Sequence, residues 1–217
     1  MWNKILQFFS ASTTEKFNIS DNLDATSSLL RKATAEKEAG NLDEAINLLR
    51  RAYELTKIEG MECSVETFLR LPIYLQKAGR NDEAWREFNI LLTHSYPNQN
   101  KDPQLVPMAN SIVYDKMRLF LQRENKNDLA VRFGVCSYVS WAVGLYRQKR
   151  KNELKDCIDQ ENIEYSVEKL LKKARKIHLQ DKLVKTVKEQ LAELPNINFA
   201  QLSRVVDGIV FQENKKQ

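Results

Sequence analysis

The stretch Lys37–Leu55, KEAGNLDEAINLLRRAYEL, occurs a second time in similar form at Gln76–His94, QKAGRNDEAWREFNILLTH. The two copies match at a spacing of 39 residues, with Gly40 over Gly79 and, five residues later, one alanine over another. A repeat period between about 20 and 50 residues is typical of stacked structural units. The repeated stretch therefore predicts an array in which one unit occurs more than once.

Each copy has an apolar-periodic segment, a glycine, an acidic pair and a second apolar-periodic segment, which is the pattern of a helical hairpin. The glycine fits the left-handed residue that ends the first helix. Ala45 and Ala84 fall where the two antiparallel helices would cross, because a small side chain lets the backbones approach closely. Four side chains are candidate N-caps of the second helices: Asn41, Asp43, Asn81 and Asp82.

The composition predicts a nearly all-α protein. The chain has 217 residues but only 6 Gly and 5 Pro, so few turns are available, and good helix formers are abundant. No apolar run reaches 18 residues, so we expect no membrane span. The three cysteines are an odd, widely spaced set, and MWNKILQFF is a poor secretory signal. The cysteine pattern favours buried thiols in a reducing compartment, and the weak signal argues against secretion. We therefore expect a cytoplasmic protein.

The segment AGNLDEAINLLRRAYEL (39–55) resembles the second half of a tetratricopeptide repeat, a pattern of Gly, Ala, an aromatic residue and Ala. The second copy fits less fully. A third, degenerate copy lies within YDKMRLFLQRENKNDLAVRFGVCSYVSW (114–141), where Asn125 takes the glycine place and Ala130 the alanine place. The resemblance implies an all-α, tetratricopeptide-like array of antiparallel helix hairpins, an α-solenoid. A generic helical bundle is the alternative.

We expect three regions: an apolar segment and linker at 1–20, about three helix pairs at 21–146, and a basic helical region at 147–217 that packs on the array and caps it. The copy spacings of 39 and then 46 depart from the family period of about 34. Pro72 stands at a place where the family has a small residue inside the first helix. Because proline breaks a helical hydrogen bond, this helix either starts near Leu71 or bends there.

In this family the first helix of each pair lines the concave face, which binds extended peptides or helices. The resemblance therefore implies a protein or peptide partner along that face. Carried over by register, the partner-binding residues are Thr34, Lys37, Glu38, Glu66, Leu69, Ile73, Gln76, Lys77, Asp115, Leu119, Gln122 and Arg123. A merely solvated surface remains the alternative for each of them. The expected function is that of an adaptor or scaffold for protein–protein interaction.

The N-terminal segment carries five large apolar residues that are costly to leave in water: Trp2, Ile5, Leu6, Phe8 and Phe9. Three fates are open. The segment packs on its own array, mediates homo-oligomerisation, or touches a membrane surface.

The positive charge is concentrated in the C-terminal third. Residues 147–190 hold 13 Lys and Arg against 8 Asp and Glu, and 13 minus 8 equals the net charge of the whole chain, +5. Four lysines at helical spacing form a basic face: Lys169, Lys172, Lys173 and Lys176. A solvated face, an acidic protein partner and a nucleic acid are all open. In the alternative function the basic helices bind nucleic acid, in a regulatory role, and the repeats serve for dimerisation.

No motif for catalysis, metal or cofactor binding stands out, so we expect a non-enzyme. His94 and His178 lie far apart in the sequence, and no cysteine pair has zinc-ligand spacing. Cys136 sits in the apolar stretch FGVCSYVSW, which favours an inert buried thiol over a nucleophile.

Overall fold

The computed structural model describes residues 25–59, 62–94 and 101–211, and within these ranges it contains helices and no extended strand. The N-terminal segment at 1–20, with its three predicted fates, lies outside the described residues. The helices are α2 (Ala25–Glu38), α3 (Leu42–Glu59), α4 (Val65–Lys77), α5 (Asn81–Leu92), α6 (Val106–Arg123), α7 (Asn127–Arg147), α8 (Lys151–Ile158), α9 (Gln160–Ala174), the short 3₁₀ turn η1 (Ile177–Leu179), α10 (Gln180–Ala192) and α11 (Phe199–Phe211). The predicted all-α class is confirmed.

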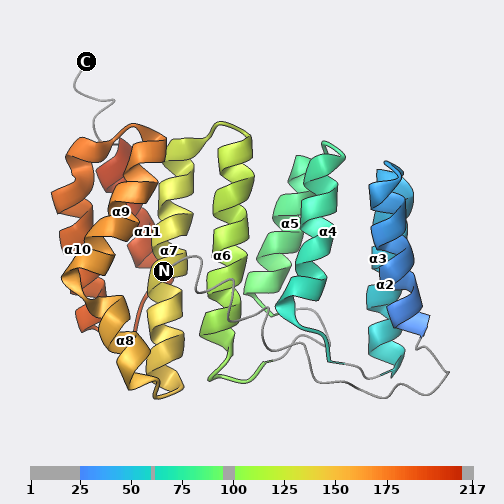
Figure 1. Cartoon of the computed structure of the whole chain (residues 1–217), viewed down its shortest axis with the longest axis horizontal. Coiled ribbons are helices and arrows are strands. Elements are labelled where there is room, and N and C mark those ends of the chain that lie inside the picture. The colour runs from blue at the N-terminus through green and yellow to red at the C-terminus, as the bar shows by residue number, and fades with distance from the viewer. Residues whose placement is uncertain (1–24, 60–61, 95–100, 212–217) are drawn as a thin grey trace.

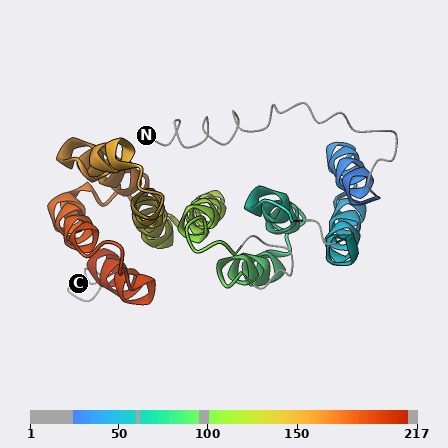
Figure 2. The same ribbon diagram turned by 90° about the horizontal axis from the view of Figure 1, so that it is seen from below.

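The helices from α2 to α7 form three consecutive antiparallel pairs, α2 with α3, α4 with α5 and α6 with α7 (Figure 1). Neighbouring pairs touch through α3 and α4, and through α6 with both α4 and α5. The remaining helices gather around α7, which contacts α8, α9, α10 and α11 as well as α6. Seen at right angles, α4 and α5 lie on opposite sides of the row, with α6 next to both (Figure 2).

One turn geometry closes all three pairs. Its central residue is left-handed, with φ of 88° at Gly40, 74° at Gly79 and 59° at Asn125. Glycine has no Cβ, and asparagine tolerates this region better than most residues, so these three positions were predictable. The next N–H closes the turn on a carbonyl five residues back, from Asn41 to Glu36 (2.8 Å), Arg80 to Leu75 (2.9 Å) and Lys126 to Leu121 (2.9 Å).

The same turn occurs twice more where the sequence did not signal it, at Lys149 (φ 58°) and Arg175 (φ 57°). What separates the first three turns from the fourth is the residue five positions later. Ala45, Ala84 and Ala130 are buried to within 1% of full burial, whereas the corresponding place after Lys149 holds the larger Leu154. The close hairpin with a small residue in the second helix therefore occurs in three pairs and then stops.

Replacing Lys149 with Gly is expected to raise the free energy of unfolding by about 0.5–1 kcal/mol, because a side chain with a Cβ is strained at its positive φ. The residue is exposed, so the substitution removes no packing. Denaturant unfolding measures the change. Lys149→Ala is the matched control and should bring no gain; a gain as large as that of glycine would contradict the left-handed turn.

The predicted N-caps of the second helices are wrong where the structure shows the caps. Arg80 is the N-cap of α5 and no side chain caps it, while Asn81 leaves its amide oxygen buried and without a hydrogen bond. The Asn41 side chain instead donates to Glu36 of the preceding helix, at 2.7 Å. In each tight turn a backbone N–H just before the second helix donates to a carbonyl of the first helix. This hydrogen bond fixes the start of the second helix, which in other proteins a capping side chain does.

Pro72 lies inside α4, so the alternative that this helix starts near Leu71 is wrong. A proline has no N–H to offer the carbonyl four residues back, which here belongs to Phe68. The hydroxyl of Tyr53, on α3, donates to the Thr67 carbonyl at 2.6 Å and approaches the Phe68 carbonyl at 3.4 Å. Burial raises the pKa of Tyr53 well above its ordinary value, so the hydroxyl keeps the proton it donates. The first pair thus compensates the break in the second.

Replacing Tyr53 with Phe is expected to lower the free energy of unfolding by about 1–3 kcal/mol, because buried carbonyls lose their donor while the ring still packs. Denaturant unfolding provides the measurement. In a Pro72→Ala background the cost should shrink, since the restored N–H serves the Phe68 carbonyl. An equal cost in both backgrounds would show that the hydroxyl does not compensate for the proline.

A charge cluster ties the first two pairs together on the side of their second helices. Glu83 of α5 accepts from Arg50 of α3 at 2.8 Å and from Arg80 at 2.7 Å, and Arg80 also reaches Asp43 at 3.5 Å. Hydrogen bonds from Arg80, and then from Arg50, lower the pKa of Glu83 to about 2. The Glu83 carboxylate is therefore charged throughout the physiological range and links α5 to α3 through Arg50.

The core has two parts that meet between α6 and α7. One cluster joins side chains of α2 to α6, and the other joins α7 to α11 together with Met108 of α6. Tyr114 of α6 packs against both clusters and stacks on Phe199 of α11 with ring centroids 5.9 Å apart. The C-terminal helices therefore share a core with α7.

Candidate functional site: two faces of the helix array

The first helices α2, α4 and α6 are joined through polar side chains. Arg70 of α4 donates to the Leu30 carbonyl at 2.6 Å and to the Thr34 hydroxyl at 2.8 Å, both on α2. From the same helix, Gln76 donates to the Phe120 carbonyl of α6 at 3.0 Å, and Arg123 donates back to Gln76 at 2.9 Å. These bonds link α2 to α4 and α4 to α6. We call this surface the first-helix face.

Most of the residues carried over from the family register are accessible on this face. The exposed ones are Glu38, Glu66, Lys77 and Arg123, and the half-exposed ones are Thr34, Lys37, Ile73, Gln76, Asp115, Leu119 and Gln122. The prediction that Leu69 contacts a partner is wrong, because Leu69 is 1% exposed and belongs to the core. It is buried because α4 is flanked by α3, α5 and α6, so the helix has more than one inward face.

An ion pair on α6 includes a residue that the sequence analysis missed. Arg118 binds Asp115 at 2.6 Å and donates to Gln122 at 3.0 Å. Their side chains keep only 16% (Arg118) and 13% (Asp115) of their exposure. Spacings of three and four on one helix were the available signal. Asp115 and Gln122 are thus already engaged within α6, and they offer a partner less than their positions suggested.

The basic face on α9 is smaller than predicted. Lys169, Lys172 and Lys173 are exposed, and Lys172 pairs with Glu168. The prediction that Lys176 belongs to this basic face is wrong. Its side chain is 13% exposed, and its ammonium group lies 3.6 Å from the carboxylate of Asp128, at the start of α7. The helix ends at Ala174 and the chain turns at Arg175, so Lys176 leaves the helical period that grouped it with the other lysines.

A surface hollow of about 420 Å³ lies between α5, α6 and α7, and no sequence signal indicated it. Its lining is mostly apolar, with Trp85 and Leu92 from α5 and Leu129 and Phe133 from α7, and its polar members are Asn89, Lys126 and Arg132. Trp85 packs edge-on against Phe120 at 5.0 Å and lies 5.6 Å from Phe133. We call it the apolar hollow. It requires three helices from two different pairs, which explains why a period within one helix did not reveal it.

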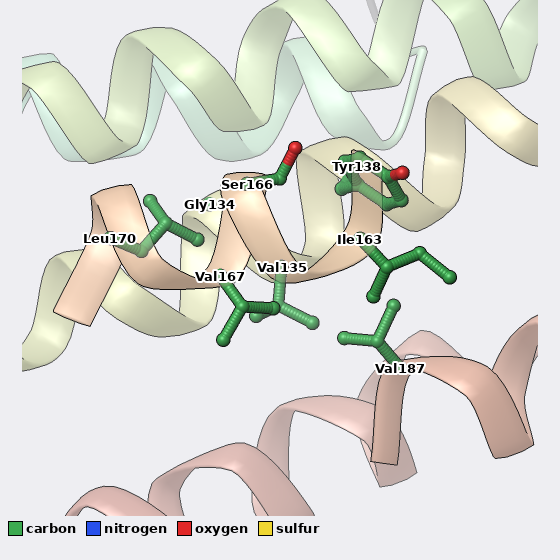
Figure 3. A pocket seen from close by; sticks show the side chains of 8 residues that line it. All are labelled: Gly134, Val135, Tyr138, Ile163, Ser166, Val167, Leu170 and Val187. Carbon is green, nitrogen blue, oxygen red and sulfur yellow. The ribbon is translucent and has the colours of Figure 1, made fainter. Parts of the chain in front are cut away.

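A second cavity, between α7, α9 and α10, is enclosed and only about 10 Å³ in volume (Figure 3). Its lining includes Gly134, Ile163, Val167 and Leu170, and the hydroxyl of Ser166 has no hydrogen-bond partner. A Cβ on Gly134 would come within 2.4 Å of Leu170, so the glycine allows α9 to pack closely on α7. This space holds at most one water molecule, which is too small for a substrate.

Two of the three cysteine thiols lie in surroundings that suppress their reactivity. Burial raises the pKa of the Cys136 thiol to about 11 and that of the Cys157 thiol to about 12. Since the thiolate is the nucleophile, both groups are inert near neutral pH. His94 lies 2.9 Å from the side-chain oxygen of Asn110. No group of three or more His, Cys, Asp or Glu side chains suited to a metal ion occurs in the described ranges.

One helix of the described part, α7, is long and apolar enough to cross a membrane by length and composition. However, 78% of its apolar window is buried inside the fold, where it forms the centre of the second core cluster. The core helix of a water-soluble protein passes the same test, so this is weak evidence for a span.

No protein-family model, curated protein or solved structure matches this chain.

Proposed function

We propose that this chain is a tetratricopeptide-like helical scaffold, cytoplasmic and without an enzymatic activity of its own, that binds a segment of a partner protein along the first-helix face. The observation that carries the proposal is the single turn geometry at Gly40, Gly79 and Asn125, each followed five residues later by a buried alanine. Repeated turns of one kind, each followed by a small buried residue, are typical of stacked helix pairs, in which the first helices are neighbours. Their exposed surface then forms a continuous docking face.

The chemistry of this face fits a peptide with both charges. Lys37, Lys77 and Arg123 are its accessible cations, and Glu38 and Glu66 are its accessible anions. The cross-helix bonds of Arg70 and Gln76 hold the lining helices in place before a partner arrives, which reduces the entropy lost on binding. The alternative function, nucleic-acid binding by the basic helices, loses one of its four lysines to the ion pair with Asp128.

Changing Lys37, Lys77 and Arg123 to Glu together is expected to remove partner proteins captured from an extract of the source cell. The substitutions reverse the accessible positive charge of the face and leave the core intact, and Arg123→Glu also removes the hydrogen bond to Gln76. The matched control reverses three accessible cations on other helices, Arg51, Arg86 and Lys151, with the same change in net charge. Comparison of the captured proteins by mass spectrometry gives the result. An unchanged set for the first variant would show that the first-helix face is not the binding surface.

A further inference from the structure

The apolar hollow continues into two further hollows at one end of the helices. The next one, of about 560 Å³, is lined by the α6–α7 turn and by the last residues of α9 and α11. These segments lie at the same end of the helices (Figure 1). This second hollow shares Lys126 and Leu129 with the apolar hollow and adds Lys173 and Arg175. Shared lining residues mean that the two hollows are neighbours on the surface.

The third hollow, of about 400 Å³, runs along the outer side of α9 and shares Lys173 with the second. It lies beside Tyr165, whose side chain is 56% exposed, and beside Lys169 and Lys172. The three hollows therefore form one continuous surface, apolar at the Trp85 end and basic at the Tyr165 end. We call this surface the bipartite track.

The positive charge of the track is not cancelled by its acidic residues. The two carboxylates that line the track each pair with a lysine, Glu168 with Lys172 and Asp128 with Lys176 at 3.6 Å, and the neighbouring Glu124 pairs with Lys126 at 2.8 Å. Among the described residues no ion pair involves Lys169, Lys173 or Arg175, and all three are exposed. These three cations are available to an anionic partner.

We propose that the bipartite track docks an acidic peptide segment of another protein that carries an apolar anchor. The anchor, one or two aromatic or aliphatic side chains, fills the apolar hollow against Trp85 and Phe133, because a hollow of this size and lining is completed by apolar surface. The carboxylates that follow it pair with Lys169, Lys173 and Arg175.

The apolar end favours a peptide over a nucleic acid. A phosphodiester strand pairs with the same lysines and stacks a base on Tyr165, but it has no aliphatic group for the hollow beside Leu92 and Leu129. Three unpaired cations also give a short run of phosphate contacts. The inference takes from the proposed function only that the partner is a protein. The surface itself is separate, because the track and the first-helix face share no residue.

The test is the binding of a synthetic labelled peptide of about ten residues, which spans about 33 Å when extended. It carries Leu-Phe-Leu at one end and four glutamates at the other. We expect the peptide to bind, with an affinity that falls as the salt concentration rises, and to change the fluorescence emission of Trp85. The emission change should be absent in Trp85→Phe. A peptide with glutamines for the glutamates, and one with serines for the apolar residues, should each bind at least about tenfold more weakly.

The double variant Lys169→Glu with Lys173→Glu should also reduce the affinity for the peptide about tenfold, and both positions are exposed, so folding is preserved. The variant of Lys37, Lys77 and Arg123 should bind it unchanged. If that variant loses the peptide while the α9 variant keeps it, the peptide lies on the first-helix face, which overturns the inference but not the proposed function. Tighter binding of a labelled oligonucleotide through Lys169 and Lys173, or no binding of the peptide at all, also overturns it.

Discussion

Replacing Ala84 with Trp is expected to lower the free energy of unfolding by about 3 kcal/mol or more. Ala84 is fully buried on α5, the second helix of its pair, five residues after the left-handed Gly79. An indole at this place has no room and must push α4 and α5 apart. Ala45 has the same place in the first pair and the same zero exposure, so Ala45→Trp should have a similar cost.

Thermal and denaturant unfolding measure both effects. Arg86→Trp is the matched control, since Arg86 is exposed on the same helix as Ala84 and should tolerate the indole within about 0.5 kcal/mol. An unchanged melting temperature for either alanine variant would mean that the small residues do not set the distance between the paired helices. The register on which the first-helix face depends would then be wrong.

The hairpins could be predicted because their signals are local. Gly40, Gly79 and Asn125 are residue types that accept a positive φ, and each precedes an alanine at a fixed distance, so the turn and the close crossing were both visible in the sequence. Lys149 and Arg175 adopt the same turn without any such preference. Packing of the flanking helices determines the backbone there, and tertiary context of this kind leaves no trace at the residue itself.

The candidate site was predictable only where one helix period determines exposure. Lys77 and Arg123 lie on the outer side of their helices, as the register implied, whereas Leu69 is buried because α4 has neighbours on several sides. Lys176 was grouped with lysines of a helix that in fact ends two residues earlier. The apolar hollow is formed by the relative positions of α5, α6 and α7, which the spacing of residues within a single helix does not encode.

Replacing Phe120 with Ala is expected to have the largest effect on stability, a loss of about 3–5 kcal/mol. The Phe120 ring is 1% exposed and forms the contact between the second and third pairs, with ring centroids 5.0 Å from Trp85 and 5.9 Å from Phe88. Truncation leaves a cavity between α5 and α6 where the two pairs meet. In an array the total stability depends on such contacts between neighbours. The loss should therefore also weaken the coupling between the α2–α5 part and the rest of the chain.

This second consequence separates an array from a single globule. We expect urea unfolding of Phe120→Ala, followed by circular dichroism, to become broader or to split into two steps, while Phe120→Leu, which keeps most of the volume, should remain in one step and lose about 1–1.5 kcal/mol. A globule with one shared core loses stability but keeps a single sharp transition, since no part of it unfolds alone. A sharp single transition in Phe120→Ala would therefore argue against stacked pairs, and with them against a docking face built from successive first helices.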